Sequence, residues 1–169
     1  MTQPLVDPTL DRLFRHMAWA NAHVLGKLAD LPSEVLSCVA PKSDWSIGAI
    51  VEHYVRSAGF YASRLGASVA DFDLLLPSSP EEIINYRIIC AENDAKLRAL
   101  GRESEGETTY FREGRLITRA RSTILGQSIY HATEHRAQIA GILVLHGITA
   151  IDLDEIDVWA LGDAEGLGE

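Results

Sequence analysis

Apolar residues recur at the three- and four-residue spacing of amphipathic helices in four long segments of the chain. Ser46 and Ser79 are suitable N-caps, and Pro80 suits the first helical position after Ser79. Gly66 and Gly101 follow the last apolar residues of their segments, where glycine commonly ends a helix. The predicted helices cover about residues 7–28, 46–65, 79–100 and, from a start between 118 and 122, the stretch to about 146.

The connection between the third and fourth helices has a different pattern. Residues 108–118 read Thr-Thr-Tyr-Phe, then Arg-Glu-Gly-Arg, then Leu-Ile-Thr. This indicates a short hairpin or an extended excursion with its turn near Gly114. The whole pattern therefore predicts an all-α fold, a four-helix bundle with the hairpin or excursion before its last helix. We expect it to form a single domain over residues 1–169.

Acidic residues outnumber basic ones, and the formal net charge of the 169 residues is -9. No block of basic residues stands out, so neither nucleic acid nor an anionic membrane surface is an expected partner. Part of the acidic excess lies in the tail, residues 150–169. The tail also carries Val158, Trp159 and Leu161, which we expect to pack on the bundle.

The two cysteines, Cys38 and Cys90, are far apart in the sequence and form no Cys-x-x-Cys motif. A disulfide framework is not expected, and a reducing compartment is the simpler interpretation. The N-terminal stretch has neither the basic start nor the apolar core of a signal peptide. The longest apolar run, residues 139–145, is too short to span a bilayer. We expect a soluble cytoplasmic protein.

Histidines supply the candidate chemistry. His131 and His135 lie four residues apart in the fourth predicted helix, so both imidazoles share one face. His53 lies in the middle of the second predicted helix, on a stripe that should also face the interior. Three neutral imidazoles can bind zinc, nickel, iron or copper and leave a coordination position open for catalysis. The alternative for each is a hydrogen-bonded core histidine, and spacing alone leaves both interpretations open.

Other residues near these histidines could orient them or carry protons. Gln138 lies one turn beyond the second histidine of the pair and could orient it. Glu134 could act as a base if its side chain turned inward, although a solvated position is the simpler expectation. His16 and His23 share a face of the first helix, and we expect both to be partly exposed or to support the ligands. Arg136 should point away from the site, toward solvent, the third helix or a partner.

Competing motifs are absent from the sequence. A carboxylate-bridged di-iron bundle needs Glu-x-x-His pairs on two helices. Glu52-His53 and Glu134-His135 are instead adjacent residues, which point about 100° apart on a helix. The His-Glu-x-x-His motif, the Gly-x-Ser-x-Gly motif and the glycine-rich nucleotide-binding motifs do not occur. The common protease, hydrolase and nucleotide-binding signatures are therefore excluded.

Three short motifs together resemble the DinB-like superfamily. The first is Met-Ala-Trp-Ala-Asn at residues 17–21, and the second is Trp-Ser-Ile at residues 45–47, leading into Glu52-His53. The third is His-Ala-Thr-Glu-His-Arg-Ala-Gln-Ile at residues 131–139, with Gly147 ending the helix. The motifs occur in order over almost the whole chain.

This resemblance implies an up-down-down-up four-helix bundle, which in many members forms a homodimer. It also implies a metal held by one histidine of the second helix and two of the fourth, which are His53, His131 and His135 in this sequence. The ion would be divalent zinc, nickel or iron. Members with a known activity include S-transferases and a maleylpyruvate isomerase that use low-molecular-weight thiols, and many others are described only as metal-dependent hydrolases.

We therefore expect a metal-dependent enzyme that acts on a small-molecule substrate, with a low-molecular-weight thiol activated at the three-histidine site. A metal-dependent hydrolase and a non-catalytic metal-binding stress-response protein are the alternatives. A metal site that opens to a cleft favours catalysis, whereas a fourth protein ligand, such as His16 or His23, favours a structural role.

Overall fold

The computed structural model describes residues 7–70 and 74–167, and these residues are mostly helical. The ends of the predicted domain, residues 1–6 and 168–169, lie outside the described part. The α-helices are α1 (Pro8–Ala29), α2 (Ile47–Arg64), α3 (Pro80–Leu100), α4 (Arg121–Leu145) and α5 (Val158–Ala164), and the strands are β1 (Glu107–Arg112) and β2 (Arg115–Ala120). Within the described residues, no helix has both the length and the apolar character needed to cross a membrane.

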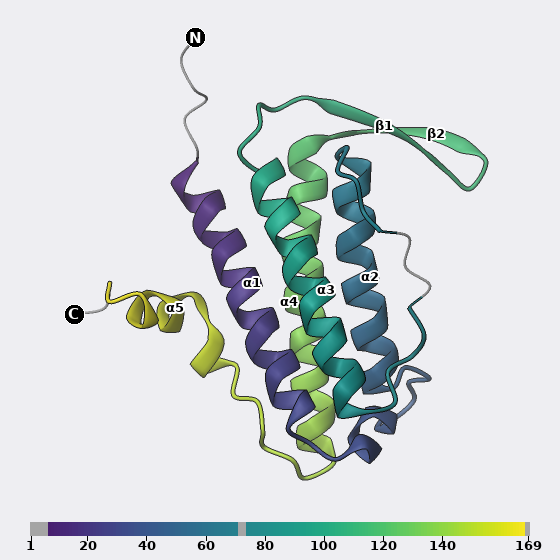
Figure 1. Ribbon diagram of the computed structural model, residues 1–169, viewed down its shortest axis with the longest axis vertical. Coiled ribbons are helices and arrows are strands. Elements are labelled where there is room, and N and C mark those ends of the chain that lie inside the picture. Colours follow the sequence, from purple (N-terminus) through teal and green to yellow (C-terminus); the bar gives the residue numbers. More distant parts are fainter. Residues whose placement is uncertain (1–6, 71–73, 168–169) are drawn as a thin grey trace.

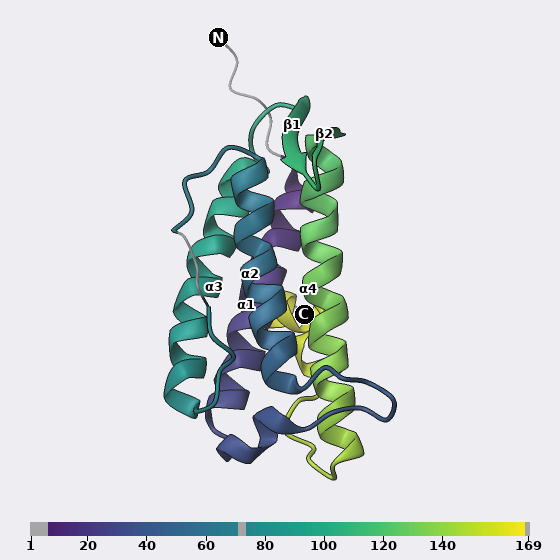
Figure 2. The ribbon, with the colours of Figure 1, turned by 90° about the vertical axis from the view of Figure 1, so that its right-hand side faces the viewer.

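The four long helices lie side by side (Figure 1). Helix α1 packs against α3 and α4, and α2 packs against the same two helices from the other side. Figure 2 shows α2 and α4 adjacent on the face that carries the site described below. Following the chain in Figure 1, α1 and α4 run in one direction and α2 and α3 in the other.

Side-chain caps begin three of these helices where the sequence predicts. Asp7 accepts the backbone N–H groups of the first turn of α1, and Ser46 accepts the N–H of Ala49 at 3.2 Å. Ser79 accepts the N–H of Glu82 at 3.3 Å, with a proline at the start of α3. Each cap satisfies an N–H group that has no partner inside the helix. The predicted helix boundaries are therefore closely confirmed.

The predicted excursion before the last helix is a β-hairpin. Strands β1 and β2 pair antiparallel, with Tyr110 opposite Ile117. The turn lies at Glu113 and Gly114, whose φ angles of 50° and 78° are both positive. Two consecutive positive φ angles match the twist of a two-residue hairpin turn, and glycine adopts them without strain. The turn predicted near Gly114 is confirmed.

The core consists of two apolar clusters separated along the helices by buried polar residues. One cluster contains Val24 and Ile139, and the other contains Met17 and Leu97. Buried polar side chains occupy the helical turns at which the chain passes from one cluster to the other. We call this set the polar layer: Asn21 on α1, Asn93 and Asp94 on α3, and His135 and Arg136 on α4.

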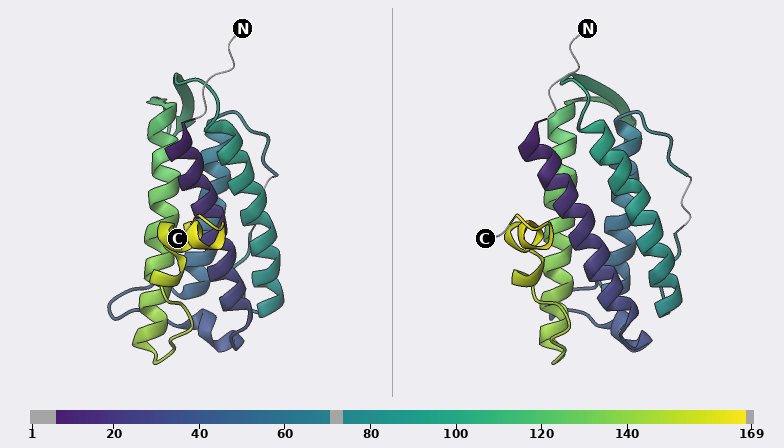
Figure 3. Two further views of the ribbon diagram at one scale, coloured as in Figure 1. Left: turned by 90° about the vertical axis from the view of Figure 1, so that its left-hand side faces the viewer. Right: turned by 60° about the vertical axis from the view of Figure 1, so that its left-hand side comes forward.

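The C-terminal segment crosses the outside of α1 and α4, as Figure 3 shows. Its anchors are Ile151, Ile156 and Leu161, which are all buried. The expectation that Val158 and Trp159 pack on the bundle is wrong, because Trp159 is 85 % exposed and Val158 is also exposed. The short helix α5 presents one inward position per turn, and Leu161 takes it, so Trp159 points to solvent.

Candidate metal centre

Three histidine side chains from two adjacent helices converge on one point. His53 comes from α2, and His131 and His135 come from successive turns of α4. The Nε2 atom of His131 lies 3.1 Å from Nε2 of His53 and 3.2 Å from Nε2 of His135. The candidate ligand atoms of all three lie within 4.8 Å of one another. The structure thus brings together the three histidines singled out in the sequence.

Hydrogen bonding alone does not account for this convergence. His135 donates its Nδ1–H to Oε1 of Gln138 at 2.7 Å, so its Nε2 carries a lone pair and no hydrogen. His131 Nε2 faces two imidazole nitrogens but has only one hydrogen or one lone pair to offer. A cation at the centre would accept a lone pair from each ring at once.

The spacing of the nitrogens suits one ion. Two imidazole nitrogens bound at about 2.0–2.1 Å lie roughly 3.3 Å apart at a tetrahedral ion and roughly 2.9 Å apart at an octahedral ion. The separations of 3.1 and 3.2 Å fall between these values. Among the described residues, this group contains three imidazoles and no carboxylate or thiol. The site therefore fits a divalent transition metal with at least one further position for another ligand.

The surroundings keep the three rings neutral. Burial is the largest cause that lowers the pKa of His131, to about 4, and the neighbouring His135 and His53 act in the same direction. Burial is also the main cause that lowers the pKa values of His53 and His135. Neutral imidazoles keep the lone pairs that a metal requires, so the rings are ready to act as ligands near neutral pH.

Aromatic side chains enclose the cluster. The Trp45 ring packs edge-on against His53, with centroids 4.7 Å apart, and lies nearly parallel to His135 at 6.1 Å. Tyr61 packs edge-on against His131 at 5.6 Å. These contacts limit the rotation of the imidazoles, and Gln138 fixes the tautomer of one of them. Trp45 precedes the N-cap of α2, so the start of that helix sets the position of this wall.

The other candidate residues lie apart from the three rings. Glu134 is exposed and is not part of the candidate ligand group. The His23 ring lies 6.2 Å from Trp19 on α1 and belongs to no candidate ligand group among the described residues. The expectation that His16 is partly exposed or supports the ligands is wrong, because it is buried and its Nε2–H donates to the carbonyl oxygen of Ile156 at 2.8 Å. His16 therefore anchors the C-terminal segment.

The placement of Arg136 differs from the expectation that it points to solvent, to the third helix or to a partner. Its side chain is 3 % exposed and donates to Oδ1 of Asn21 at 2.6 Å and to Thr133 at 3.0 Å. Asn21 in turn donates to Oδ2 of Asp94 at 2.9 Å, which also accepts from the Cys90 thiol. A buried cation and a buried carboxyl are thus linked through one amide, which reduces the cost of burying each.

The sequence analysis missed this chain of hydrogen bonds, although the sequence contains a sign of it: two polar residues lie at helix positions that are otherwise apolar. Asn21 falls in the apolar stripe of α1 with Met17 and Val24, and Asp94 falls between buried Cys90 and Leu97 on α3. Burial is the largest cause that raises the pKa of Asp94, to about 6. The chain of hydrogen bonds ties α1, α3 and α4 together at the level of the histidines, so it helps to hold α4 in place.

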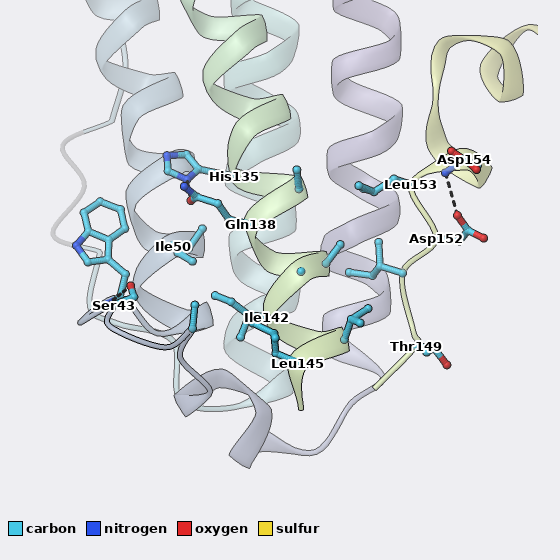
Figure 4. A pocket seen from close by; sticks show the side chains of 17 residues that line it. Ser43, Ile50, His135, Gln138, Ile142, Leu145, Thr149, Asp152, Leu153 and Asp154 are labelled. Carbon is cyan, nitrogen blue, oxygen red and sulfur yellow. Dashed lines mark hydrogen bonds between the residues drawn. The ribbon is translucent and has the colours of Figure 1, made fainter. Parts of the chain in front are cut away.

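A groove of about 1240 Å³ opens beside the cluster (Figure 4). His135 and Gln138 lie at one end of it, together with Trp45 from the loop before α2. The groove continues along α4 and reaches the segment that follows this helix, at residues 149–154. The cluster therefore borders a space large enough for a small organic molecule.

Comparison with known proteins identifies the family. The model of the DinB family matches residues 1–161. Comparisons with curated proteins and with solved structures found no match. The matched region contains all four long helices, the hairpin and the three histidines, and it confirms the resemblance seen in the sequence motifs. The chain belongs to the DinB family.

Proposed function

We propose that the protein is a metal-dependent enzyme that transfers a low-molecular-weight thiol to an electrophilic small molecule. The observation that carries this proposal is the convergence of three neutral imidazole nitrogens beside a groove of about 1240 Å³. A divalent zinc, nickel or iron ion bound there would act as a Lewis acid and lower the pKa of a coordinated thiol. The groove beside His135 would admit a second reactant.

The residues of the chain would bind the ion and orient its ligands. His53, His131 and His135 would hold the ion, and Gln138 keeps the Nε2 lone pair of His135 directed at it. Trp45 and Tyr61 pack edge-on against His53 and His131 and limit the rotation of these rings. None of these side chains is a carboxylate that could act as a general base. The neighbouring carboxylate, Glu134, is exposed.

The absence of a carboxylate from the cluster, among the described residues, favours a thiol over water as the nucleophile. A free thiol has a pKa of about 8.5 and needs only a modest shift to ionise at neutral pH. Water starts from about 15.7, and hydrolytic metal sites commonly add a general base. Hydrolysis remains the second candidate function because the same ion could activate water.

The test is thiol-dependent turnover of monobromobimane by the metal-loaded protein. We expect the fluorescent thioether to form faster than in the uncatalysed reaction with at least one of mycothiol, bacillithiol and glutathione. His131→Ala should abolish this acceleration. Turnover of ester or amide substrates without any thiol would support the hydrolase. Full metal binding with neither activity would support a metal-binding stress-response protein.

Two structural features implied by the family complete the proposal: an up-down-down-up four-helix bundle and a homodimer. The directions of α1 to α4 in Figure 1 support the first. Exposed aromatic side chains support the second, because Phe60 is 50 % and Trp159 85 % exposed. Trp19, by contrast, is partly buried against the core and offers less surface to a partner. Sedimentation equilibrium at micromolar concentration would measure the dimer directly, and a monomer would remove it.

A further inference from the structure

The floor of the groove beside the metal centre is an unusual helix surface. Ala137, Gly141 and Val144 lie along one face of α4 at helical spacing, and all are exposed. Leu145, 61 % exposed, extends this face at the end of the helix. A solvated helix face ordinarily carries charged and polar residues. Small and apolar residues here leave a hollow over which an apolar molecule can lie.

Two remote segments form the walls. Ser43 stands on one side of α4, and Leu153 and Asp154 stand on the other (Figure 4). Trp45, Leu153 and Leu145 add apolar surface above the floor. The volume of about 1240 Å³ exceeds the usual range of small-molecule sites, about 300–1,000 Å³. A molecule considerably larger than a short carboxylic acid therefore fits.

The groove is continuous with the metal centre. His135 belongs to the cluster and lines the groove together with its hydrogen-bond partner Gln138, so one end of a bound molecule would lie against this imidazole. Apolar surface in contact with a Lewis-acid site is the arrangement expected for the body of a substrate whose reactive end is at the metal.

The charged residues that line the groove are acidic. Asp152 and Asp154 are the charged residues at the end away from Trp45, and both are exposed. Among the described residues that line the groove, none is a lysine or an arginine. The net charge of the chain, -9, has the same sign. Both facts disfavour an anionic occupant and favour a cationic one.

We propose that this groove binds the electrophilic substrate of the proposed transferase, a molecule with an apolar body and a protonated amine that lies near Asp152 and Asp154. This inference rests on the proposed function for the reaction at the metal. It goes further by assigning the class of substrate: an apolar amine, not a small organic acid.

Two glycines on α4 offer a matched pair of variants. A Cβ atom added at Gly141 meets nothing within 4 Å, so Gly141→Leu fills the groove without displacing the backbone. A Cβ atom added at Gly126 also meets nothing within 4 Å, and this residue does not line the groove. Both substitutions replace glycine by a better helix former in the same helix, so neither should weaken the fold.

The experiment is calorimetric titration of the zinc-loaded protein with 4-phenylbutylamine and, as its anionic counterpart, 4-phenylbutanoate. We expect the amine to bind about fivefold more tightly than the carboxylate, the effect of an exposed charge pair. Gly141→Leu should weaken amine binding about tenfold or more, and Gly126→Leu should leave it unchanged. Asp152→Asn combined with Asp154→Asn should remove the preference for the amine.

Three outcomes would overturn the inference. Equal amine binding by Gly141→Leu and the wild type would show that the groove is not the site. Binding of the carboxylate as tightly as the amine would refute the assigned charge. A change in sedimentation of Gly141→Leu, at unchanged thermal stability, would assign the groove to a second copy of the chain. Zinc content is measured in the same samples, so loss of the metal, which refutes the proposed function, is distinguished from loss of the groove ligand.

Discussion

Replacing Gln138 tests how the chain prepares its candidate ligands. The side chain accepts the Nδ1–H of His135 at 2.7 Å, which is at the short end of the range for such bonds. This bond keeps the hydrogen on Nδ1 and the lone pair on Nε2. Gln138→Leu removes the acceptor while keeping a side chain of similar size at an exposed helix position. The imidazole can then rotate or change tautomer, so each binding event must first restore the productive form.

The expected loss of metal affinity follows from this single hydrogen bond. Groups that orient a metal-bound histidine typically contribute about 10–100-fold to metal affinity, or about 1.4–2.8 kcal/mol. The hydrogen bond between His135 and Gln138 is only partly buried, so water replaces part of the lost acceptor, which supports the middle of this range. We therefore expect the affinity for zinc to fall by about 30-fold in Gln138→Leu.

Competition with a chromophoric chelator measures this affinity. Gln138→Glu retains an acceptor oxygen and should bind zinc at least as tightly as the wild type. Glu134→Gln changes the charge of a neighbouring exposed residue and should change the affinity by less than about threefold. Nitrogen NMR of the metal-free protein should show the Nδ1–H tautomer of His135 in the wild type and a mixture in Gln138→Leu. Wild-type affinity and an unchanged tautomer in Gln138→Leu would refute the assigned role.

Three further predictions concern stability. Asn21→Leu leaves buried Arg136 and Asp94 without their shared partner, so the free energy of unfolding in urea should fall by about 3 kcal/mol, and a loss below about 1 kcal/mol would contradict the network. Burial raises the pKa of Asp94 to about 6, so the protonated group stabilises the fold fully below pH ~4, and this effect, about 3 kcal/mol, is lost as the pH rises through 6. The stability of Asp94→Asn relative to the wild type should therefore increase between about pH 4 and about pH 7 and stay constant above that. Hydrogen bonds from Arg98 and Arg102 lower the pKa of Asp11 to about 2. The ionised group therefore contributes about 1 kcal/mol to stability at this partly exposed position above pH ~4, and this contribution is lost toward pH 2. A constant difference in unfolding free energy between Asp11→Asn and the wild type over this range would contradict the prediction.

The helices were predictable because their signals are local. Caps at Ser46 and Ser79, a proline after the second cap and the spacing of apolar residues each act within a few positions of the chain. The same holds for the turn at Gly114. The grouping of His131 with His135 also follows from helix geometry alone, whereas the place of His53 beside them required the packing of α2 on α4.

Features that depend on three or more elements were not predictable. The polar layer joins α1, α3 and α4. His135 was expected to face the interior, but Asn93, Asp94 and Arg136, each taken alone, could have been surface residues. Arg136 shows this most clearly, because a charged residue beside His135 is ordinarily solvated, yet here Asn21 offers it a buried partner. Trp159 shows the converse: a large apolar residue was expected inside but is exposed, because Leu161 takes the inward face of a short helix.

The groove was predictable in part. Its floor comes from one face of α4, while its walls come from the loop at Ser43 and from the segment after α4. Nothing in the spacing of these segments places them together. The low polarity of the floor is nevertheless visible in the sequence once α4 is known, because Ala137, Gly141 and Val144 share a face.

The central claim is that His53, His131 and His135 bind one divalent metal ion. Elemental analysis of the protein purified without an affinity tag tests it most directly, beside the double variant His131→Ala, His135→Ala. We predict about one equivalent of zinc, nickel or iron per chain in the wild type and none in the variant, at similar helix content. A wild-type protein that holds no metal, even after incubation with zinc and with nickel, would contradict the account and leave the three histidines as a buried structural cluster.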